Sequence, residues 1–395
     1  QMMGLRTQFV HLWVCDQTEK SNDTFEDYGL FTQVEQLNKT ALKAHGLDKS
    51  GHLYKVNSFD FHRYKDTIKL ADDPGYNQAN FEGMLEIKGD SDHTKLIEML
   101  DALNDESQKI DNVLDTYFDT ENLVYWLAFQ ILTGNCDTQN RNCYLYSPLN
   151  SNTWYFLDWD NDGMLRKLEL SLTGFSDYAS WERGASNYWG NVLFNRALRS
   201  KSFRSELDGA VKDLRSYMTE ARLSKMIKHY REVTESLVFA SPDIDHLPVT
   251  KDQYEQIAAA IPSEIEENYK SFRESFKKPM PFYIGVPQID NGKLRINWDA
   301  SYDFEARDIR YTVELARDYA IKDVLFKAED VLLPEVTCDA PDAGQYFVRV
   351  RATNSDGYTQ DAFDYYVTDD GKHYGMKCFY VQDGGKVVED TYEEG

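Results

Sequence analysis

The pattern of apolar and polar positions predicts a β-rich start to the chain. Residues 8–16 (QFVHLWVCD) alternate as a half-buried strand, and after a polar turn residues 28–37 (YGLFTQVEQL) alternate in the same way. Two such runs separated by a turn indicate a β-hairpin. Residues 35–46 have apolar positions at helical spacing and end at Gly46, a residue type common after helix C-termini. A short apolar run, HLYKV, follows at residues 52–56.

A buried helix is predicted over residues 120–133 (TENLVYWLAFQILT). Asp119 and Thr120 can cap its start, and the run is apolar nearly all round until Gly134. A helix of this character lies in the centre of a domain, so it would hold the following loop on a rigid platform. Residues 142–160 are then predicted to form two strands joined by a turn.

The rest of the chain divides into a helical stretch and a β-rich stretch. Residues 189–277 show spaced apolar positions with charged faces, which predicts a supporting helical lobe. After the segment KKPMP, short strands recur at regular spacing, which predicts a β-sandwich. The positions of Trp298, Tyr311 and Tyr346 resemble a fibronectin type III module, in which Tyr346 would be the tyrosine-corner residue.

Length and composition fit two or three domains. The 395 residues are too many for one ordinary core, and 42% of them are hydrophobic, enough to bury a sizeable core. We expect an α+β domain over residues 1–280, an all-β immunoglobulin-like or fibronectin type III sandwich over residues 281–382, and an acidic tail over residues 383–395.

The charge excludes two classes of partner. With 43 basic and 67 acidic side chains the net charge is −24, which repels phosphate backbones and anionic membrane surfaces, so no nucleic acid is expected as a partner.

No apolar run reaches the length of a membrane span. The five cysteines have no metal-site spacing and are predicted to be unpaired thiols.

The candidate chemistry lies between residues 134 and 163. Asp137 precedes Asn142 by five positions, and an alternating acidic cluster of Asp158, Asp160 and Asp162 follows the second predicted strand. Phosphoryl transfer needs a positioned hydroxyl and one or two divalent cations. Asp137 would align and deprotonate the acceptor, while Asn142 and Asp160 would bind the metal.

A calcium loop is the alternative reading of the acidic cluster. Residues 158–169 (DWDNDGMLRKLE) match the EF-hand pattern, with Glu169 at its last position and Gly163 at its sixth. An EF-hand needs an entering helix, whereas the preceding WYFL is strand-like. Both readings make the cluster a metal site, with Ca²⁺ the ion of the alternative.

These motifs resemble the CotH spore-coat kinase family. The run YWLAFQILTGNCDTQNRNCYLYSP followed by WYFLDWDNDG is similar to that family's GN-x-D loop, N-x-Y-L-Y strand and W-D-x-D metal motif. The resemblance covers residues 5–275. It implies an atypical kinase fold with a β-rich N-lobe and a helical C-lobe, which uses ATP and Mg²⁺ or Mn²⁺ to phosphorylate Ser or Thr of a protein substrate.

The resemblance assigns roles residue by residue. Asp137 matches the catalytic Asp, Asn142 and Asp160 match metal ligands, and Asp162 matches the second acid of the metal motif. In the small lobe, two polar positions match recurring residues that could contact the nucleotide, namely Lys55 and Glu35. Asp158 departs from the family pattern, which has proline or an apolar residue there. Family members also carry further strands that would precede residue 1.

The expected setting is a secreted or cell-surface bacterial protein, with the β-sandwich as a spacer or contact surface for cell-surface partners. Any export signal would have to lie upstream of residue 1. One alternative function is a non-catalytic adhesion or interaction protein with a kinase-like fold, with or without a bound cation. Another is an interaction module stabilised by calcium at residues 158–169.

Overall fold

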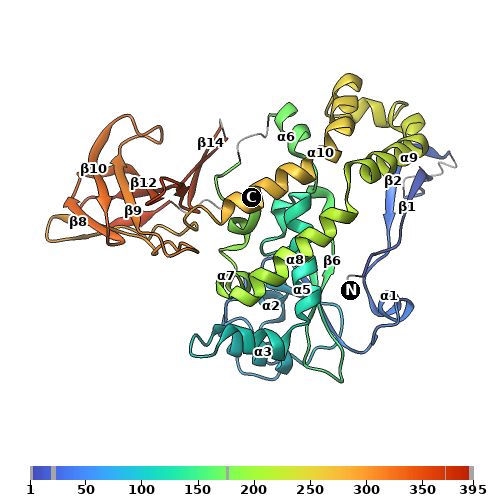
Figure 1. Ribbon diagram of the computed structural model, residues 1–395, viewed down its shortest axis with the longest axis horizontal. Helices are drawn as coiled ribbons and strands as arrows, with labels where there is room; N and C mark the ends of the chain where they lie inside the picture. The colour runs from blue at the N-terminus through green and yellow to red at the C-terminus, as the bar shows by residue number, and fades with distance from the viewer. Residues whose placement is uncertain (1–2, 19–23, 175–177, 370, 391–395) are drawn as a thin grey trace. The chain divides into compact units, whose positions relative to one another are not determined.

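The computed structural model describes residues 3–18, 24–174, 178–369 and 371–390. The chain forms two compact units (Figure 1). The first comprises Gln1–Ser176 and Asn191–Asn268, and the second comprises Asp177–Gly190 and Tyr269–Gly395. Each unit is described by itself.

The first unit begins with the predicted hairpin. Strands β1 (Thr7–Val14) and β2 (Glu26–Val34) pair antiparallel, with an irregular register after Leu12. The helix predicted over residues 35–46 is shorter, because α1 (Lys39–Ala44) starts only where the Asn38 side chain caps its first turn. The N-terminal part is thus β-rich with one short helix, as the sequence indicates.

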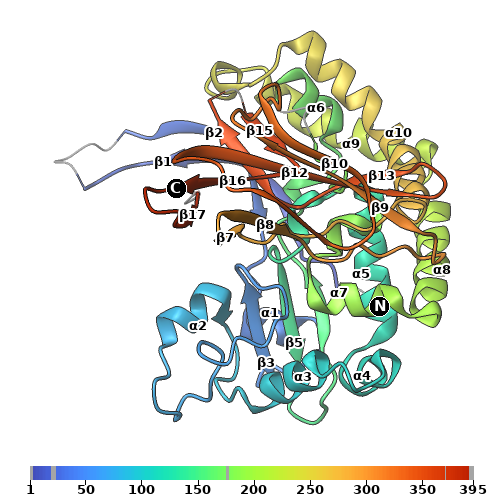
Figure 2. The same cartoon turned by 90° about the vertical axis from the view of Figure 1, so that its left-hand side faces the viewer.

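A four-stranded antiparallel sheet carries the segments on either side of the candidate chemistry. Its order is β4 (Leu85–Ile87), β3 (His52–Val56), β5 (Cys143–Ser147) and β6 (Tyr155–Asp158). Figure 2 shows β3 and β5 side by side. The predicted strand pair over residues 142–160 is therefore confirmed, and HLYKV becomes a central strand of the sheet.

Helix α5 (Thr120–Thr133) is the buried helix that the sequence predicts. Asp119 caps its start, Trp126 and Leu127 are fully buried, and Gly134 ends it in the left-handed conformation at φ 64°. It packs against β6 and α8 (Lys201–Tyr217). The other helices of the unit are α2 (Gln78–Met84), α3 (Thr94–Asn104), α4 (Ile110–Tyr117), α6 (Lys167–Leu172), α7 (Val192–Arg199), α9 (Glu220–Val238) and most of α10 (Lys251–Ser275).

A buried amide joins α5 to β6. The Asn122 Nδ2 donates to the Phe156 carbonyl at 3.0 Å, and its Oδ1 accepts from the Phe156 N–H at 2.7 Å. Both backbone groups would lose this partner if the amide were removed. The contact fixes how the end of β6, and the acidic cluster after it, lie relative to α5.

We expect Asn122→Ala to lower the free energy of unfolding by about 3 kcal/mol, since it leaves two buried backbone groups unpaired. Asn112→Ala, on the exposed side of α4, is the matched control, because it makes the same change in a helix without removing a buried hydrogen bond. Urea unfolding of both variants measures the difference. Equal losses for the two would contradict the role of Asn122.

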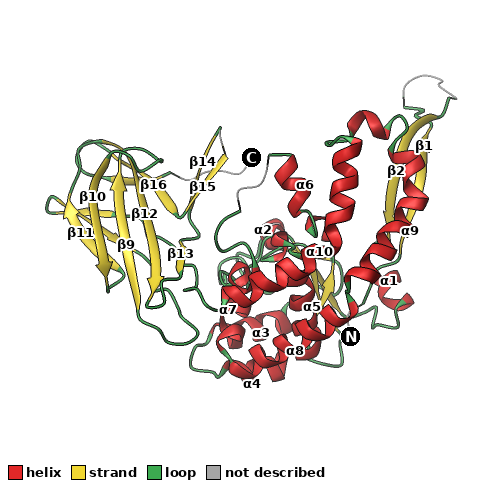
Figure 3. Cartoon of the chain, turned by 45° about the horizontal axis from the view of Figure 1, so that its top comes forward, coloured by secondary structure: helices red, strands yellow, loops and turns green. Residues whose placement is uncertain are grey.

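The second unit is the predicted β-sandwich (Figure 3). One sheet runs β10 (Val324–Val331), β9 (Ile309–Ala316), β12 (Gly344–Asn354), β16 (Met376–Val381) and β17 (Val387–Glu389), with β13 (Thr359–Asp361) beside β12. The other runs β11 (Glu335–Asp339), β8 (Lys293–Asn297) and β7 (Gln288–Asp290). A separate pair is formed by β14 (Tyr365–Thr368) and β15 (Gly371–Tyr374).

The core of this unit contains the aromatic residues that suggested a fibronectin-like module. Trp298 and Tyr311 lie edge to face, with ring centroids 5.2 Å apart. The Tyr346 hydroxyl donates to the carbonyl of Asp342, four residues upstream, at 3.0 Å. This is the geometry of a tyrosine corner. The α+β fold class, with an all-β sandwich as the second unit, is confirmed.

Both borders of the predicted sandwich differ from the structure. The acidic tail was expected from residue 383, but β17 pairs with β16, so the sheet continues to Glu389; residues 391–395 lie outside the described residues. The unit also includes an earlier segment, in which the indole of Trp181 donates to the Ala362 carbonyl at 3.2 Å. A long-range contact of this kind leaves no local pattern in the sequence.

Candidate active site

The Asp137 loop starts where α5 ends. After the left-handed Gly134, the short 3₁₀ helix η1 (Cys136–Thr138) carries Asp137. Asn142 closes the loop with a positive φ of 58° just before β5 begins. Asn is among the residues that tolerate this conformation best. The loop is therefore fixed at one end by a buried helix and at the other by a central strand.

The side chains of Asp137 and Asn142 are in contact. The Asn142 Nδ2 donates to the Asp137 Oδ2 at 2.8 Å, and the Arg141 Nε lies 3.6 Å from the Oδ1. Burial raises the pKa of the Asp137 carboxyl above its usual value; Arg141 and Asn142 oppose that rise, and Asp162 and Asp160 add to it. A carboxyl whose pKa is raised in this way is a better proton acceptor than an ordinary Asp.

The acidic loop after β6 contains two kinds of carboxylate. Asp160 and Asp162 are exposed, and Asp160 is left-handed at φ 56°. Asp158 is mostly buried and accepts from the Gln130 Nε2 at 3.1 Å, and burial raises its pKa to about 6. The exposed pair is available to a cation, whereas Asp158 is engaged by α5.

The acidic loop offers two exposed carboxylates, which are not part of a complete protein metal cage among the described residues. Within the described ranges, no three His, Cys, Asp or Glu side chains are grouped so that they could hold a metal ion. Asp160 and Asp162 supply two carboxylates, and the Asn142 Oδ1 belongs to an amide whose nitrogen is turned to Asp137. Mg²⁺ is commonly bound by one or two carboxylates together with substrate phosphates and waters. These residues therefore fit a nucleotide-bound Mg²⁺.

The calcium-loop reading finds no support in the geometry. Asp158 ends a β-strand rather than an entering helix. Glu169, the expected bidentate ligand, accepts from the Arg166 guanidinium with both oxygens, at 2.9 and 2.8 Å. The match of residues 158–169 to the EF-hand pattern is therefore a match of residue types without the corresponding fold.

Lys55 and Glu35, the two residues that could contact the nucleotide, lie in different surroundings. Lys55 on β3 extends over the ring of Trp159, with its Nζ 5.8 Å from the centroid, which brings it beside the acidic loop. Glu35 follows β2 and accepts from the Arg6 Nε at 3.0 Å, and the His45 Nε2 lies 2.7 Å from its other oxygen. Lys55 therefore lies beside the acidic loop, whereas Glu35 joins the hairpin to the end of α1.

Glu35 should make the unfolding free energy sensitive to acid. Its hydrogen bonds from Arg6, and then from His45, lower its pKa from 4.5 to about 2. A lowered folded-state pKa gives stability that is present above the unfolded pKa and is lost as the pH falls toward the folded one. We expect Glu35→Gln to unfold at a lower temperature than wild type above about pH 5, and the difference to vanish near pH 2.

Thermal unfolding from pH 7 to pH 2 checks this expectation. Glu98→Gln, at an exposed position on α3, is the matched control and should follow the wild-type curve. A constant difference between Glu35→Gln and wild type over the whole range would contradict the assignment.

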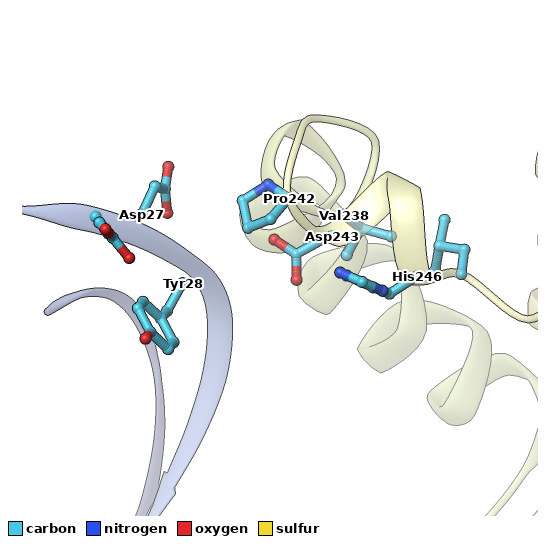
Figure 4. A pocket seen from close by; sticks show the side chains of 8 residues that line it. Asp27, Tyr28, Val238, Pro242, Asp243 and His246 are labelled. Atoms are coloured by element: carbon cyan, nitrogen blue, oxygen red, sulfur yellow. The ribbon is translucent and has the colours of Figure 1, made fainter.

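A pocket of about 510 Å³ lies between β2 and η4 (Asp243–His246) (Figure 4). The Asp243 carboxylate accepts from the Leu30 N–H at 3.0 Å and so caps the edge of β2. The lining residues are Glu26, Asp27, Tyr28, Val238, Pro242, Asp243, His246 and Leu247. None of them is a predicted site residue, so this pocket is distinct from the site around Asp137.

Sequence reasoning missed two buried amides beneath the site. Gln130 and Asn135 are each 1% exposed, and Asn135 accepts from the Asp137 N–H. The available signal was a polar residue in an otherwise apolar helix, since buried amides need hydrogen-bond partners.

Comparison with known proteins assigns the chain to a family. The family model described as CotH kinase protein matches residues 1–272. The chain therefore belongs to the CotH kinase family. No curated protein matches it. A solved structure of the twitchin kinase region from C. elegans is 18% identical over 24% of this chain and 20% of that one, at a TM-score of 0.19, which is too limited a likeness to describe the fold.

Proposed function

We propose that the chain transfers the γ-phosphate of ATP to Ser or Thr of a secreted or cell-surface protein. The observation that carries the proposal is the Asp137–Asn142 hydrogen bond beside the exposed Asp160 and Asp162. Membership of the CotH kinase family supports the reaction class. No helix in the described part of the chain is long and apolar enough to cross a membrane.

Each residue has a distinct task. Asp137 orients the acceptor hydroxyl and takes up its proton, helped by the burial that raises its pKa. Asp160 and the Asn142 oxygen would hold Mg²⁺, with Asp162 as the second acid of the loop. When bound, the cation neutralises charge on the transferred phosphate. Lys55, whose Nζ lies over the Trp159 ring beside the acidic loop, would contact the nucleotide phosphates, and Glu35 ties the hairpin to Arg6.

A transfer assay tests the proposal. The chain is incubated with γ-labelled ATP and a Ser-rich acceptor protein, with Mg²⁺, with Mn²⁺, or with excess EDTA. We expect label on Ser or Thr, located by mass spectrometry, only when a divalent cation is present. No label on either the chain or the acceptor with both cations would overturn the proposal.

An interaction protein without catalysis is the second candidate, because the hairpin exposes large aromatic side chains. Trp13 is 50% exposed, Tyr28 49%, and Phe25, just before β2, 62%. Exposed aromatic surface often marks a binding site for another protein. Under this function the β-sandwich would be a further contact surface. Binding of a cell-surface partner that does not depend on ATP or Mg²⁺, without any transfer, would favour it.

A further inference from the structure

A chain of buried amides links the Asp137 loop to the acidic loop. The Gln130 Nε2 donates to the Asp158 Oδ1 at 3.1 Å and to the Asn161 Oδ1 at 3.2 Å. The Asn135 Nδ2 donates to the Gln130 Oε1 at 3.0 Å and to the Asn161 Oδ1 at 3.3 Å. The Asn135 Oδ1 in turn accepts from the Asp137 N–H at 3.3 Å.

The direction of each amide is determined by these contacts. The Gln130 nitrogen points toward Asp158 and Asn161, and the Asn135 nitrogen points toward the Gln130 oxygen and Asn161. The Asn135 oxygen points toward the Asp137 backbone. Reversing either amide would set donor against donor or acceptor against acceptor. Because Gln130 and Asn135 are buried, water cannot replace the lost bonds.

The lack of a side chain at Gly163 allows the acidic loop to pack closely against the Asp137 loop. A Cβ at this position would lie 2.7 Å from the Asn135 Oδ1 and 3.7 Å from the Asp137 Cβ. The first distance is shorter than real side chains allow, so any larger residue would push the loops apart. Gly163 is not among the glycines with positive φ, so the requirement is for space and not for an unusual backbone conformation.

We propose that Gln130 and Asn135 form an amide brace, with Gly163 seated against it, that sets the position of Asp137 relative to the metal-binding Asp160 and Asp162. They are positioning residues, because they act through the residues that touch substrate and metal. The brace also engages Asp158, so that the third carboxylate of the cluster anchors the loop instead of binding the cation. The catalytic part of this inference rests on the proposed function.

The test compares two separate variants, each of which adds one methyl group at a glycine. Gly163→Ala disturbs the brace, whereas Gly83→Ala in α2 places its Cβ in open space and is the matched control. Gln130→Met removes the amide at nearly constant volume and is the second variant. Hydrogen exchange followed by mass spectrometry reports on residues 135–142 and 158–165, and steady-state kinetics separates kcat from KM for ATP.

We expect exchange to accelerate in both loops together in Gly163→Ala and Gln130→Met, and in neither loop in Gly83→Ala. We expect kcat to fall by about tenfold to a hundredfold with KM for ATP little changed, since a displacement of about 1 Å between reacting groups can cost a hundredfold in rate.

Acceleration in only one loop, or an unchanged kcat in both variants, would overturn the brace. If wild type transfers no phosphate, the proposed function fails, and the exchange data alone still decide whether the brace links the loops. If Gln130→Met does not fold, the same outcomes are read from Gly163→Ala.

Discussion

Asp137→Asn is expected to lower the rate of phosphoryl transfer by about a hundredfold to ten-thousandfold, the usual contribution of a general base. Asn has the same shape, so the loop between α5 and β5 should keep its conformation. Its amide cannot take up the proton of the acceptor hydroxyl. Since Asp137 acts on the acceptor and not on the nucleotide, the affinity for Mg²⁺-ATP should stay close to that of wild type.

Single-turnover transfer of labelled phosphate, together with ATP titration by calorimetry, measures both quantities. Asp115→Asn, at an exposed position on α4, is the matched control and should behave as wild type. If Asp137→Asn kept the wild-type rate, another residue would be the base. If it lost ATP binding instead, Asp137 would belong to the nucleotide site.

Asp160→Asn is expected to weaken the Mg²⁺-dependent binding of ATP by at least about tenfold to a hundredfold. Metal affinity already falls by this factor when a residue that hydrogen-bonds to a metal ligand is changed, and Asp160 is proposed as a ligand itself. Asp160 is exposed at the start of η2 (Asn161–Gly163) and brings a full negative charge to the loop. The amide would leave the loop's geometry in place while removing that charge.

Asp158→Asn distinguishes the kinase site from the calcium loop. Its side chain keeps an oxygen that can accept from the Gln130 amide, so the Mg²⁺ dependence of ATP binding should be retained. In a calcium loop, Asp158 and Asp160 would both be ligands, and both variants would lose cation binding. Titrations of each variant with Mg²⁺-ATP and with Ca²⁺ alone therefore separate the two readings.

The main elements of the fold could be predicted because they are set by local patterns. The nearly continuous apolar run of α5 and the glycine after it define a buried helix and its end, whatever surrounds them. Alternation gave the hairpin and the strand pair around residues 142–160. Asp137 and Asn142 lie on one short loop between α5 and β5, so their closeness follows from the sequence, whereas the hydrogen bond between them is seen only in the structure.

Contacts between distant segments could not be predicted in the same way. The hydrogen bond between Arg6 and Glu35 joins residues 29 positions apart, which face each other only once the hairpin has formed. The role of Gln130 depends on Asp158, which is 28 positions away. The EF-hand pattern likewise records residue types but not whether a strand or a helix enters the loop.

The most direct test of the central claim is a structure of the chain with Mg²⁺ and a non-hydrolysable ATP analogue. The account predicts that the cation contacts Asp160 and the Asn142 oxygen, and that the terminal phosphate lies next to Asp137. A nucleotide bound elsewhere, or a cation held by Asp158 and Glu169 instead, would contradict it.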